Sequence, residues 1–385
     1  MQKYDIHVCL VSTQAAANLL PVLDTDFKPR EVLLVVSQDM EEEANALTLV
    51  FEAQGVNVRY QNITSVSDFG YLENTFESIC KENKDKNIAL NATGGNKAMV
   101  IAANNMFRKY NKAVFYLEAR NNRISFLYQS NEGNYFSDFS LDAEITLETY
   151  LAAYGIKANP TVTNINTVRL NAMTAAFING YNTFNPYVYK LNWYANRMKD
   201  FKSELLTDDL QDKDFIKLLN QLSSVDKNKG IIKFNGKVID YKNPNEKSFT
   251  NGGWFEEFTY SRLKENQEVK DIQCSLHVNN DIYGNEYSAK DFNRNELDVV
   301  FIAKDKLHII ECKTSQISAT EGAKYIYKLE ALKKYGGSMT KACLVSYEKV
   351  PSSVKQRAKA AGIYIISGFD LKDFDKEITK WISER

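Results

Sequence analysis

The first 130 residues alternate between strand-like and helix-like segments, and this alternation restricts the possible folds more than any other feature of the sequence. Five apolar runs predict strands, at 4–12, 31–37, 56–60, 87–93 and 113–119. The segments between them predict helices, at 14–24, 39–54, 67–83 and 95–110. Parallel strands need helical crossovers, so this order indicates a doubly wound α/β sheet. A further run at 123–129 predicts an antiparallel strand that closes one edge of it.

The chain, at 385 residues, is longer than one ordinary hydrophobic core supports. We expect a Rossmann-like domain at 1–155, a helical connector at 156–245 and a second α/β domain at 246–385. In the connector, helices are predicted up to Leu206 and near 208–225, after a polar segment that ends at 167. Asn235-Gly236 within 231–241 predicts a hairpin, which we interpret as structural in preference to the wing of a helical DNA-binding module.

Composition excludes several classes of protein. Apolar residues make up 44% and charged residues 25% of the chain, as in soluble globular proteins. The five cysteines form no CxxC pair, which argues against a zinc site or a disulfide framework and favours a reducing cytoplasm. No run approaches 18 apolar residues, so we expect no membrane contact. The net charge of −1 requires that any nucleic-acid binding use a local basic surface, and nine Lys or Arg between Lys324 and Lys359 offer one.

The second domain contains a strand pair with a concentration of charged residues. A helix at 252–265 and strands at 268–278, 296–302 and 306–313 are predicted there, followed by helix, strand, helix, strand and helix. If the last two strands pair around a Lys304-Asp305 turn, Asp298 faces Glu311 and Glu296 faces Lys313. Side chains alternate with period two, so all four would share one face of the sheet, unless a bulge changes the register.

Buried carboxylates on one face repel each other unless a cation lies between them. Oxygen ligands from Asp298 and Glu311, with the backbone carbonyl of Cys312, suit Mg²⁺ or Mn²⁺. Lys313 would orient a metal-activated water or offset developing negative charge.

These residues resemble the PD-(D/E)xK nuclease superfamily, in which an acid and a short hairpin precede (D/E)xK. Asp298 and Glu311-Cys312-Lys313 match that pattern, although Leu297 stands where the superfamily usually has proline. The resemblance implies a further metal-binding glutamate from the preceding helix, where Glu256 is favoured over Glu257. After the strand that carries Glu311-Cys312-Lys313, a predicted helix offers a surface on which a phosphate backbone could run, with the side chains of Lys324, Tyr325, Lys328, Lys333 and Lys334.

The front domain has a glycine-rich turn between a predicted strand and helix, Thr93-Gly94-Gly95-Asn96-Lys97. Glycines permit close approach and a helix N-terminus presents free N–H groups, so the turn suits phosphate. It lacks the spacing of a P-loop, and no GxGxxG follows the first strand, which argues against a nicotinamide cofactor. Ser12-Thr13-Gln14 and Ser37 end other strands at the same edge, as ligand contacts or as helix caps.

The glycine-rich turn and Ser12-Thr13-Gln14 resemble the CARF domains of type III CRISPR immunity. That resemblance implies a homodimer that binds one cyclic oligoadenylate, with cyclic tetra-adenylate favoured, and thereby activates a fused nuclease that cleaves DNA, RNA or both. Two alternatives remain open from the residues. The nuclease could be a constitutive restriction-type enzyme with the front domain as dimeriser, or the chain could be a non-catalytic, ligand-responsive DNA-binding regulator.

Overall fold

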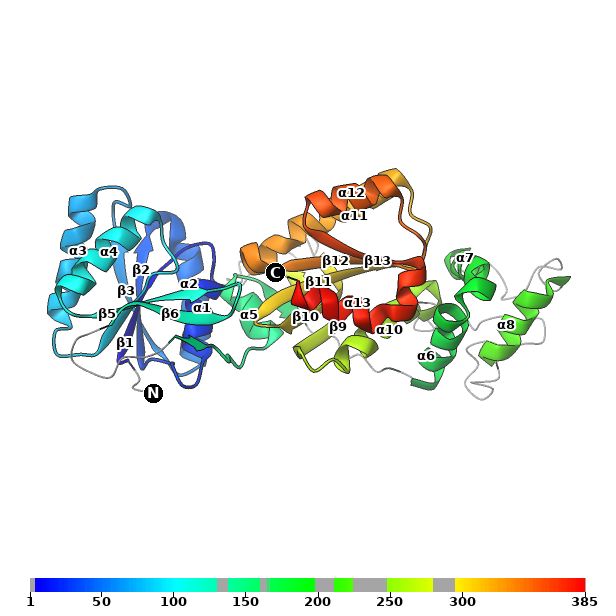
Figure 1. The fold of residues 1–385 in the computed structure, drawn as a ribbon, viewed down its shortest axis with the longest axis horizontal. Coiled ribbons are helices and arrows are strands. Elements are labelled where there is room, and N and C mark those ends of the chain that lie inside the picture. Colours follow the sequence, from blue (N-terminus) through cyan, green and yellow to red (C-terminus); the bar gives the residue numbers. More distant parts are fainter. Residues whose placement is uncertain are drawn as a thin grey trace.

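The computed structural model describes residues 4–129, 138–159, 165, 167–197, 211–223, 248–279 and 295–384. It has two α/β domains side by side, with further helices beyond the second domain (Figure 1). The predicted fold class is therefore confirmed. The hairpin predicted at 231–241 lies outside the described residues. No helix in the described ranges is long and apolar enough to span a lipid bilayer.

The first sheet has seven strands in the order β3-β2-β1-β4-β5-β6-β7. Their bounds are β1 (Ile6–Leu10), β2 (Glu31–Ser37), β3 (Asn57–Ile63), β4 (Ile88–Asn91), β5 (Ala113–Glu118), β6 (Arg123–Tyr128) and β7 (Phe139–Ser140). The first five are parallel, and β6 is antiparallel to β5 as predicted. The expectation that β6 closes the edge is wrong, because β7 pairs with it on the outside.

Helices cover both faces of this sheet, because its strands are apolar on both sides. α3 (Phe69–Glu82) and α4 (Lys97–Lys109) pack on one face, with their ends capped by Asp68 and Asn96. α1 (Ala16–Leu23) and α2 (Glu41–Ala53) pack on the other face. α2 also contacts α5 (Leu147–Ala153), which follows the sheet in the sequence.

The second sheet has six strands in the order β13-β12-β11-β10-β9-β8. Their bounds are β8 (Lys157–Asn159), β9 (Val269–Asn279), β10 (Asn295–Ala303), β11 (Lys306–Lys313), β12 (Lys341–Ser346) and β13 (Ile363–Ser367). β8 to β11 are antiparallel neighbours, whereas β11, β12 and β13 run parallel. The segment interpreted as the start of the connector thus supplies β8, an edge strand of this domain.

Helices also cover both faces of the second sheet. α11 (Ala319–Leu332) and α12 (Ser352–Ala360) lie on one face, and α10 (Trp254–Lys264) and α13 (Phe374–Ser383) on the other. The connector helices α6 (Thr167–Met173), α7 (Tyr181–Arg197) and α8 (Lys213–Ser223) contribute to the same apolar core as α10 and α13. Short turns of helix complete the fold: η1 (Gln38–Met40), η2 (Thr174–Asn179), η4 (Phe249–Gly253), η5 (Lys333–Met339) and η6 (Gly368–Asp373).

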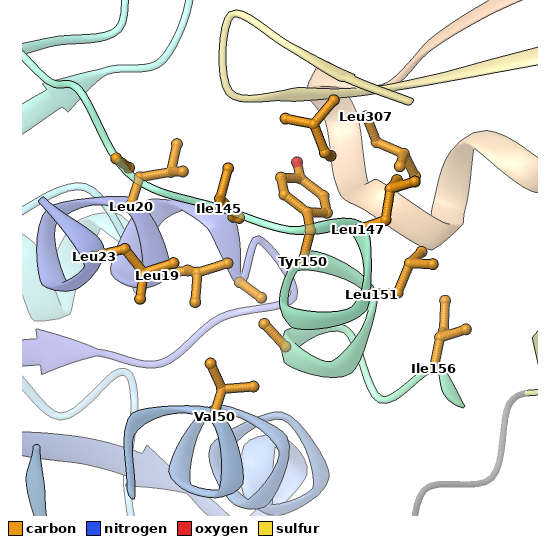
Figure 2. Packing of buried hydrophobic residues seen from close by; sticks show 14 of the residues in the cluster. Leu19, Leu20, Leu23, Val50, Ile145, Leu147, Tyr150, Leu151, Ile156 and Leu307 are labelled. Atoms are coloured by element: carbon orange, nitrogen blue, oxygen red, sulfur yellow. The ribbon is translucent and has the colours of Figure 1, made fainter. Parts of the chain in front are cut away.

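One apolar core joins the two domains through α5. Tyr150 and Leu151 are fully buried, between Leu20 of the front domain and Leu307 at the start of β11 (Figure 2). The Tyr150 hydroxyl donates to the carbonyl of Gly336 at 3.1 Å. Since each contact removes apolar surface from water on both domains, the interface stabilises both folds together.

His7 on β1 is a buried polar residue among aromatic rings. Its ring lies 4.7 Å from that of Phe27 and 5.1 Å from that of Phe115, measured between centroids. Within the described ranges neither ring nitrogen has a hydrogen-bond partner, and burial lowers the pKa of His7 to about 3. The folded state therefore keeps the ring neutral while the unfolded state takes up a proton near the ordinary value of 6.5.

Replacing His7 by Phe is expected to increase the free energy of unfolding by about 1–3 kcal/mol, because a buried group without hydrogen bonds is removed. The cost of burying a neutral His7 is constant above pH 6.5 and grows as the pH falls from 6.5 toward 3, by up to about 1.4 kcal/mol per pH unit, because protonation then stabilises the unfolded state. Urea titrations at pH 7.5 and 5.0 would measure a larger gain at pH 5.0. His277→Phe, on the half-buried part of β9, is the control. An equal gain at both pH values would contradict the prediction.

Candidate catalytic and nucleotide sites

The β10–β11 hairpin has the register that the sequence predicts. Paired residues run from Val299 with Ile310 to Ala303 with Lys306. Lys304 and Asp305 form the turn, with φ values of 49° and 53°. Two successive residues with positive φ are typical of a tight hairpin turn whose twist matches that of the strands. This turn fixes the alignment, so Asp298 and Glu311 come from neighbouring strands at the same end of the sheet.

Two carboxylates and two lysines meet at that end. Glu311 is buried, and its two oxygens bind the ammonium groups of Lys313 at 2.7 Å and Lys328 at 2.6 Å. Lys313 also lies 3.5 Å from an oxygen of Asp298, which is buried as well. The ring of Tyr325 on α11 faces the ammonium of Lys313 at 5.2 Å from the ring centroid. Opposite charges thus balance at this end of β11.

The strands separate next to these side chains. The β10–β11 ladder ends at Val299 and Ile310, and the backbone N–H of Cys312 donates to Asp298 at 2.8 Å instead of continuing it. Cys312 therefore lies beyond the last residues paired between β10 and β11, although it still pairs with Val345 of β12, and its buried thiol contacts the Thr259 hydroxyl.

The prediction that Glu296 would face Lys313 is not met. Glu296 is exposed and pairs with His277 of β9 across the backbone. In the described part of the chain, the ion pairs of Lys313 are with Asp298 and Glu311. The reason is the early end of the β10–β11 ladder, which releases the residues before Asp298 from their predicted partners.

Glu256 on α10, which is half-buried, adds a third carboxyl group. Burial first, and the charge of Asp298 second, raise the pKa of Glu256 to about 8. Its carboxyl accepts a hydrogen bond from the Ser275 hydroxyl at 3.2 Å. Ser275 has a φ of 51° within β9, a backbone conformation that residues other than glycine rarely adopt. Strand periodicity in the sequence gives no signal for this contact, because Ser275 departs from the extended backbone conformation.

Burial and the charge of Glu311 similarly raise the pKa of Asp298 to about 6. Burial works to lower the pKa of Lys313, but the charges of Asp298 and Glu311 outweigh it and the pKa is raised. Lys313 is therefore held charged beside Asp298, whose own pKa is raised. Such opposed shifts are typical of sites built for proton or metal chemistry.

The donor atoms fit a hard divalent cation, since Asp298, Glu311, Glu256 and the Cys312 carbonyl all offer oxygen. Within the described ranges, no group of three His, Cys, Asp or Glu side chains is arranged to hold a metal ion. Glu311 instead binds two lysines. A metal ion at this position would displace at least one ammonium group from a carboxylate.

At the front domain, the glycine-rich turn between β4 and α4 lies against the end of β1. A Cβ atom on Gly94 would stand 2.1 Å from the carbonyl oxygen of Leu10, and Gly95 has a φ of 73°. Glycine is therefore required at Gly94 by close contact and favoured at Gly95 by conformation. The amide of Asn18 donates to the same Leu10 carbonyl at 3.0 Å, and Asn91 donates to Asn18. These two buried asparagines support the turn and were not singled out from the sequence.

The residues predicted to contact the cyclic oligoadenylate differ in exposure and in their hydrogen-bond partners. Lys97, Asn96 and Thr13 are exposed, and Ser12 is half-buried. The side-chain amide oxygen of Asn96 caps α4, accepting from the backbone N–H of Met99 at 2.9 Å.

Three other predicted contacts have partners within the protein. Thr93 accepts from the N–H of Leu117 at 2.8 Å, and Ser37 donates to Asp39 at 2.6 Å. Gln14 accepts from both the N–H and the hydroxyl of Ser338, at 2.8 and 2.9 Å. Gln14 thus connects the edge of the first sheet to the second domain.

Comparison with known proteins matches two family models to separate parts of the chain. The family model for the Card1 CARF domain matches residues 6–150, and the model for the Card1-like endonuclease domain matches 243–384. The chain belongs to the Card1 family of CARF-domain endonucleases. No curated protein matches its sequence significantly.

Solved structures similar to this Card1-family chain extend over its whole length. Protein VC1899 from Vibrio cholerae has a TM-score of 0.84 at 24% identity, covering 98% of this chain and 97% of that one. Can2 from Sulfobacillus thermosulfidooxidans, solved with cyclic tetra-adenylate, has a TM-score of 0.78 at 24% identity and full coverage of both chains. A type III CRISPR defence DNA nuclease activated by cyclic oligoadenylate has a TM-score of 0.57 at 15% identity, covering all of this chain and 52% of that one. These likenesses show a shared fold.

Proposed function

We propose that this Card1-family chain is a metal-dependent nuclease of type III CRISPR antiviral defence that cyclic oligoadenylate activates. The observation that carries the proposal is the convergence of Asp298, Glu311 and Lys313 in the endonuclease domain, through one hairpin register. Cyclic tetra-adenylate is the proposed activator, supported by its presence in the structure of Can2. We further propose a cytoplasmic location, and DNA or RNA as substrate.

Asp298, Glu311, Glu256 and the Cys312 carbonyl would hold Mn²⁺ or Mg²⁺. When bound, such an ion makes a water molecule more acidic and stabilises negative charge on phosphate oxygens. Lys313 is held by Asp298, Glu311 and the Tyr325 ring, and so is positioned to orient the attacking water. Lys328, released from Glu311, would be free to bind a phosphate oxygen of the substrate strand.

In the front domain, the exposed side chains of Thr13, Asn96 and Lys97 and the half-buried Ser12 would contact the activator. They lie at one edge of the sheet, where α4 presents its N-terminus. A homodimer would place two such edges around a ring that has matching two-fold symmetry. The ring would activate the nuclease by binding its competent arrangement more tightly than the resting one. The contact between Gln14 and Ser338 supports communication between the domains.

A nuclease assay with purified full-length protein tests this proposal. Cleavage of labelled DNA and RNA is measured with Mn²⁺, with and without cyclic tetra-adenylate, and again with excess EDTA. We expect cleavage only when both Mn²⁺ and cyclic tetra-adenylate are present. Equal cleavage without the ring would favour a constitutive restriction-type enzyme, and no cleavage of any substrate under the full conditions would favour a non-catalytic regulator.

Lys97→Ala is expected to weaken binding of cyclic tetra-adenylate by about tenfold or more, because a charged contact to phosphate is worth roughly 1.5–3 kcal/mol. The ring concentration needed for half-maximal cleavage should rise by the same factor, while the maximal rate stays close to that of wild type. Lys109→Ala, at the other end of α4, makes the same charge change as a control. Unchanged affinity of Lys97→Ala would show that the ring binds elsewhere.

A further inference from the structure

A basic pocket lies at the end of the second sheet away from the catalytic residues. It has a volume of about 710 Å³ and is lined by the first residues of β11, β12 and β13. Arg120, from the turn that follows β5 in the front domain, completes it. Lys306 begins β11 and Glu311 lies five residues further along, so roughly 17 Å of strand separates the pocket from the carboxylates. The chain's carboxyl end, between the domains in Figure 1, borders the pocket through Glu384.

Six cationic side chains line this pocket: Arg120, Lys306, Lys333, Lys341, Lys355 and Lys359. Glu384 is the single acidic residue among the lining residues. Across the described ranges, none of the six cations forms an ion pair with a carboxylate. The whole chain has a net charge of −1, so this concentration of positive charge is local. It includes four lysines of the basic run recognised in the sequence.

Three of the cations are held in place by backbone carbonyls. Lys306 donates to Arg120 at 3.0 Å, and Lys333 donates to Ala361 at 3.4 Å. Lys341 donates to the carbonyl of Trp381 at 2.8 Å, at the end of α13. These bonds fix the ammonium groups around the pocket but do not neutralise them. The pocket is therefore organised before any ligand binds.

The cations destabilise one another. Burial lowers the pKa of Lys341 to about 8, with a further contribution from the charge of Lys306. Burial likewise lowers the pKa of Lys306, as do the charges of Lys304 and Arg120. An anion with several oxygens would relieve the repulsion between these charged side chains.

We propose that this pocket is a second anion-binding site, which takes the phosphate groups of a nucleotide and is separate from the activator and cleavage sites. Its volume is that of a small-molecule site and accommodates a polyphosphate chain. Because Arg120 comes from the front domain and the lysines from the second, a bound polyphosphate bridges the two domains. Occupancy therefore favours the arrangement in which the domains are closed around it.

Binding of inorganic tripolyphosphate to the full-length protein tests the site directly. Calorimetric titration at about 50 mM salt should show saturable binding that weakens as salt is added. Lys355→Ala/Lys359→Ala removes two exposed cations of the pocket and should weaken binding at least about tenfold. Lys372→Ala/Lys376→Ala, which makes the same charge change outside the pocket, should bind as wild type does. Absence of saturable binding to wild type, or equal weakening in both double variants, would overturn the proposal.

Two competitors identify the source of the phosphates. If ATP displaces tripolyphosphate and a non-cleavable single-stranded oligonucleotide does not, the ligand is a free nucleotide, as proposed. If only the oligonucleotide displaces it, the pocket instead holds the backbone of a nucleic-acid strand and the nucleotide assignment is wrong. The measurement is binding alone, so its failure leaves the proposed nuclease function intact.

Discussion

Glu311→Gln is expected to lower the rate of cleavage by about a thousandfold or more, which corresponds to roughly 4 kcal/mol of transition-state stabilisation. Glu311 is the carboxylate that both lysines of the site contact, and its oxygens are the innermost of the candidate metal ligands. The amide keeps the shape of the side chain but removes the charge that would bind a cation. It also leaves Lys313 and Lys328 without their shared partner. Product formation with Mn²⁺ and saturating cyclic tetra-adenylate measures the effect.

The control for this variant is Glu321→Gln, an exposed carboxylate in the first turn of α11 whose capping role glutamine preserves. It should cleave at the wild-type rate. Binding of cyclic tetra-adenylate and the midpoint of thermal unfolding, measured for both variants, separate loss of chemistry from loss of fold. A folded Glu311→Gln protein that cleaves as fast as wild type would remove Glu311 from the catalytic assignment.

Gly94→Ala is expected to reduce the free energy of unfolding by about 3–5 kcal/mol and to abolish binding of the ring. The added Cβ atom would meet the Leu10 carbonyl oxygen at 2.1 Å, and backbone atoms cannot rotate away as a side chain could. The Leu10 carbonyl is also held by Asn18. Relief of the contact therefore requires β1 and the glycine-rich turn to move apart. Urea denaturation and calorimetric titration with cyclic tetra-adenylate measure the two effects.

Two other glycines calibrate this effect. Gly55 has a φ of 73° with no atom near its Cβ position, so Gly55→Ala should cost only about 1 kcal/mol of conformational strain. Gly70 lies in α3 with its nearest neighbouring atom at 3.7 Å, and Gly70→Ala should stabilise the protein by about 0.5–1 kcal/mol. If Gly94→Ala were no more destabilising than Gly55→Ala, the close approach to Leu10 would not be a determinant of the fold.

The sequence predicted the features that depend on local patterns. The strands and helices of both domains follow from apolar periodicity, and the Lys304-Asp305 turn set the register that joins Asp298 to Glu311. β7 and β8 were not predicted, because strands of two and three residues are too short to show an alternation of apolar and polar residues.

The sequence also could not predict contacts between residues that are far apart along the chain. The sequence predicts that Lys328 contacts a phosphate backbone but gives no sign of its ion pair with Glu311 in the structure. The sequence predicts that Gln14 contacts the cyclic oligoadenylate, and it gives no sign that the amide oxygen of Gln14 accepts a hydrogen bond from Ser338 of the other domain. Both residues were located in a functional region, but their partners depend on how α11 and η5 pack against the sheets.

The position of α5 restricts how such a protein evolves and how it is engineered. Tyr150 and Leu151 belong at once to the sensor and to the nuclease, so a cut in the chain on either side of α5 exposes apolar surface on both halves. A different sensor domain fused to this nuclease domain would need a helix whose apolar side chains pack against Leu307 and its neighbours. We therefore expect that exchanging one of the two domains alone, without refitting the α5 contact, yields a protein that is insoluble or inactive.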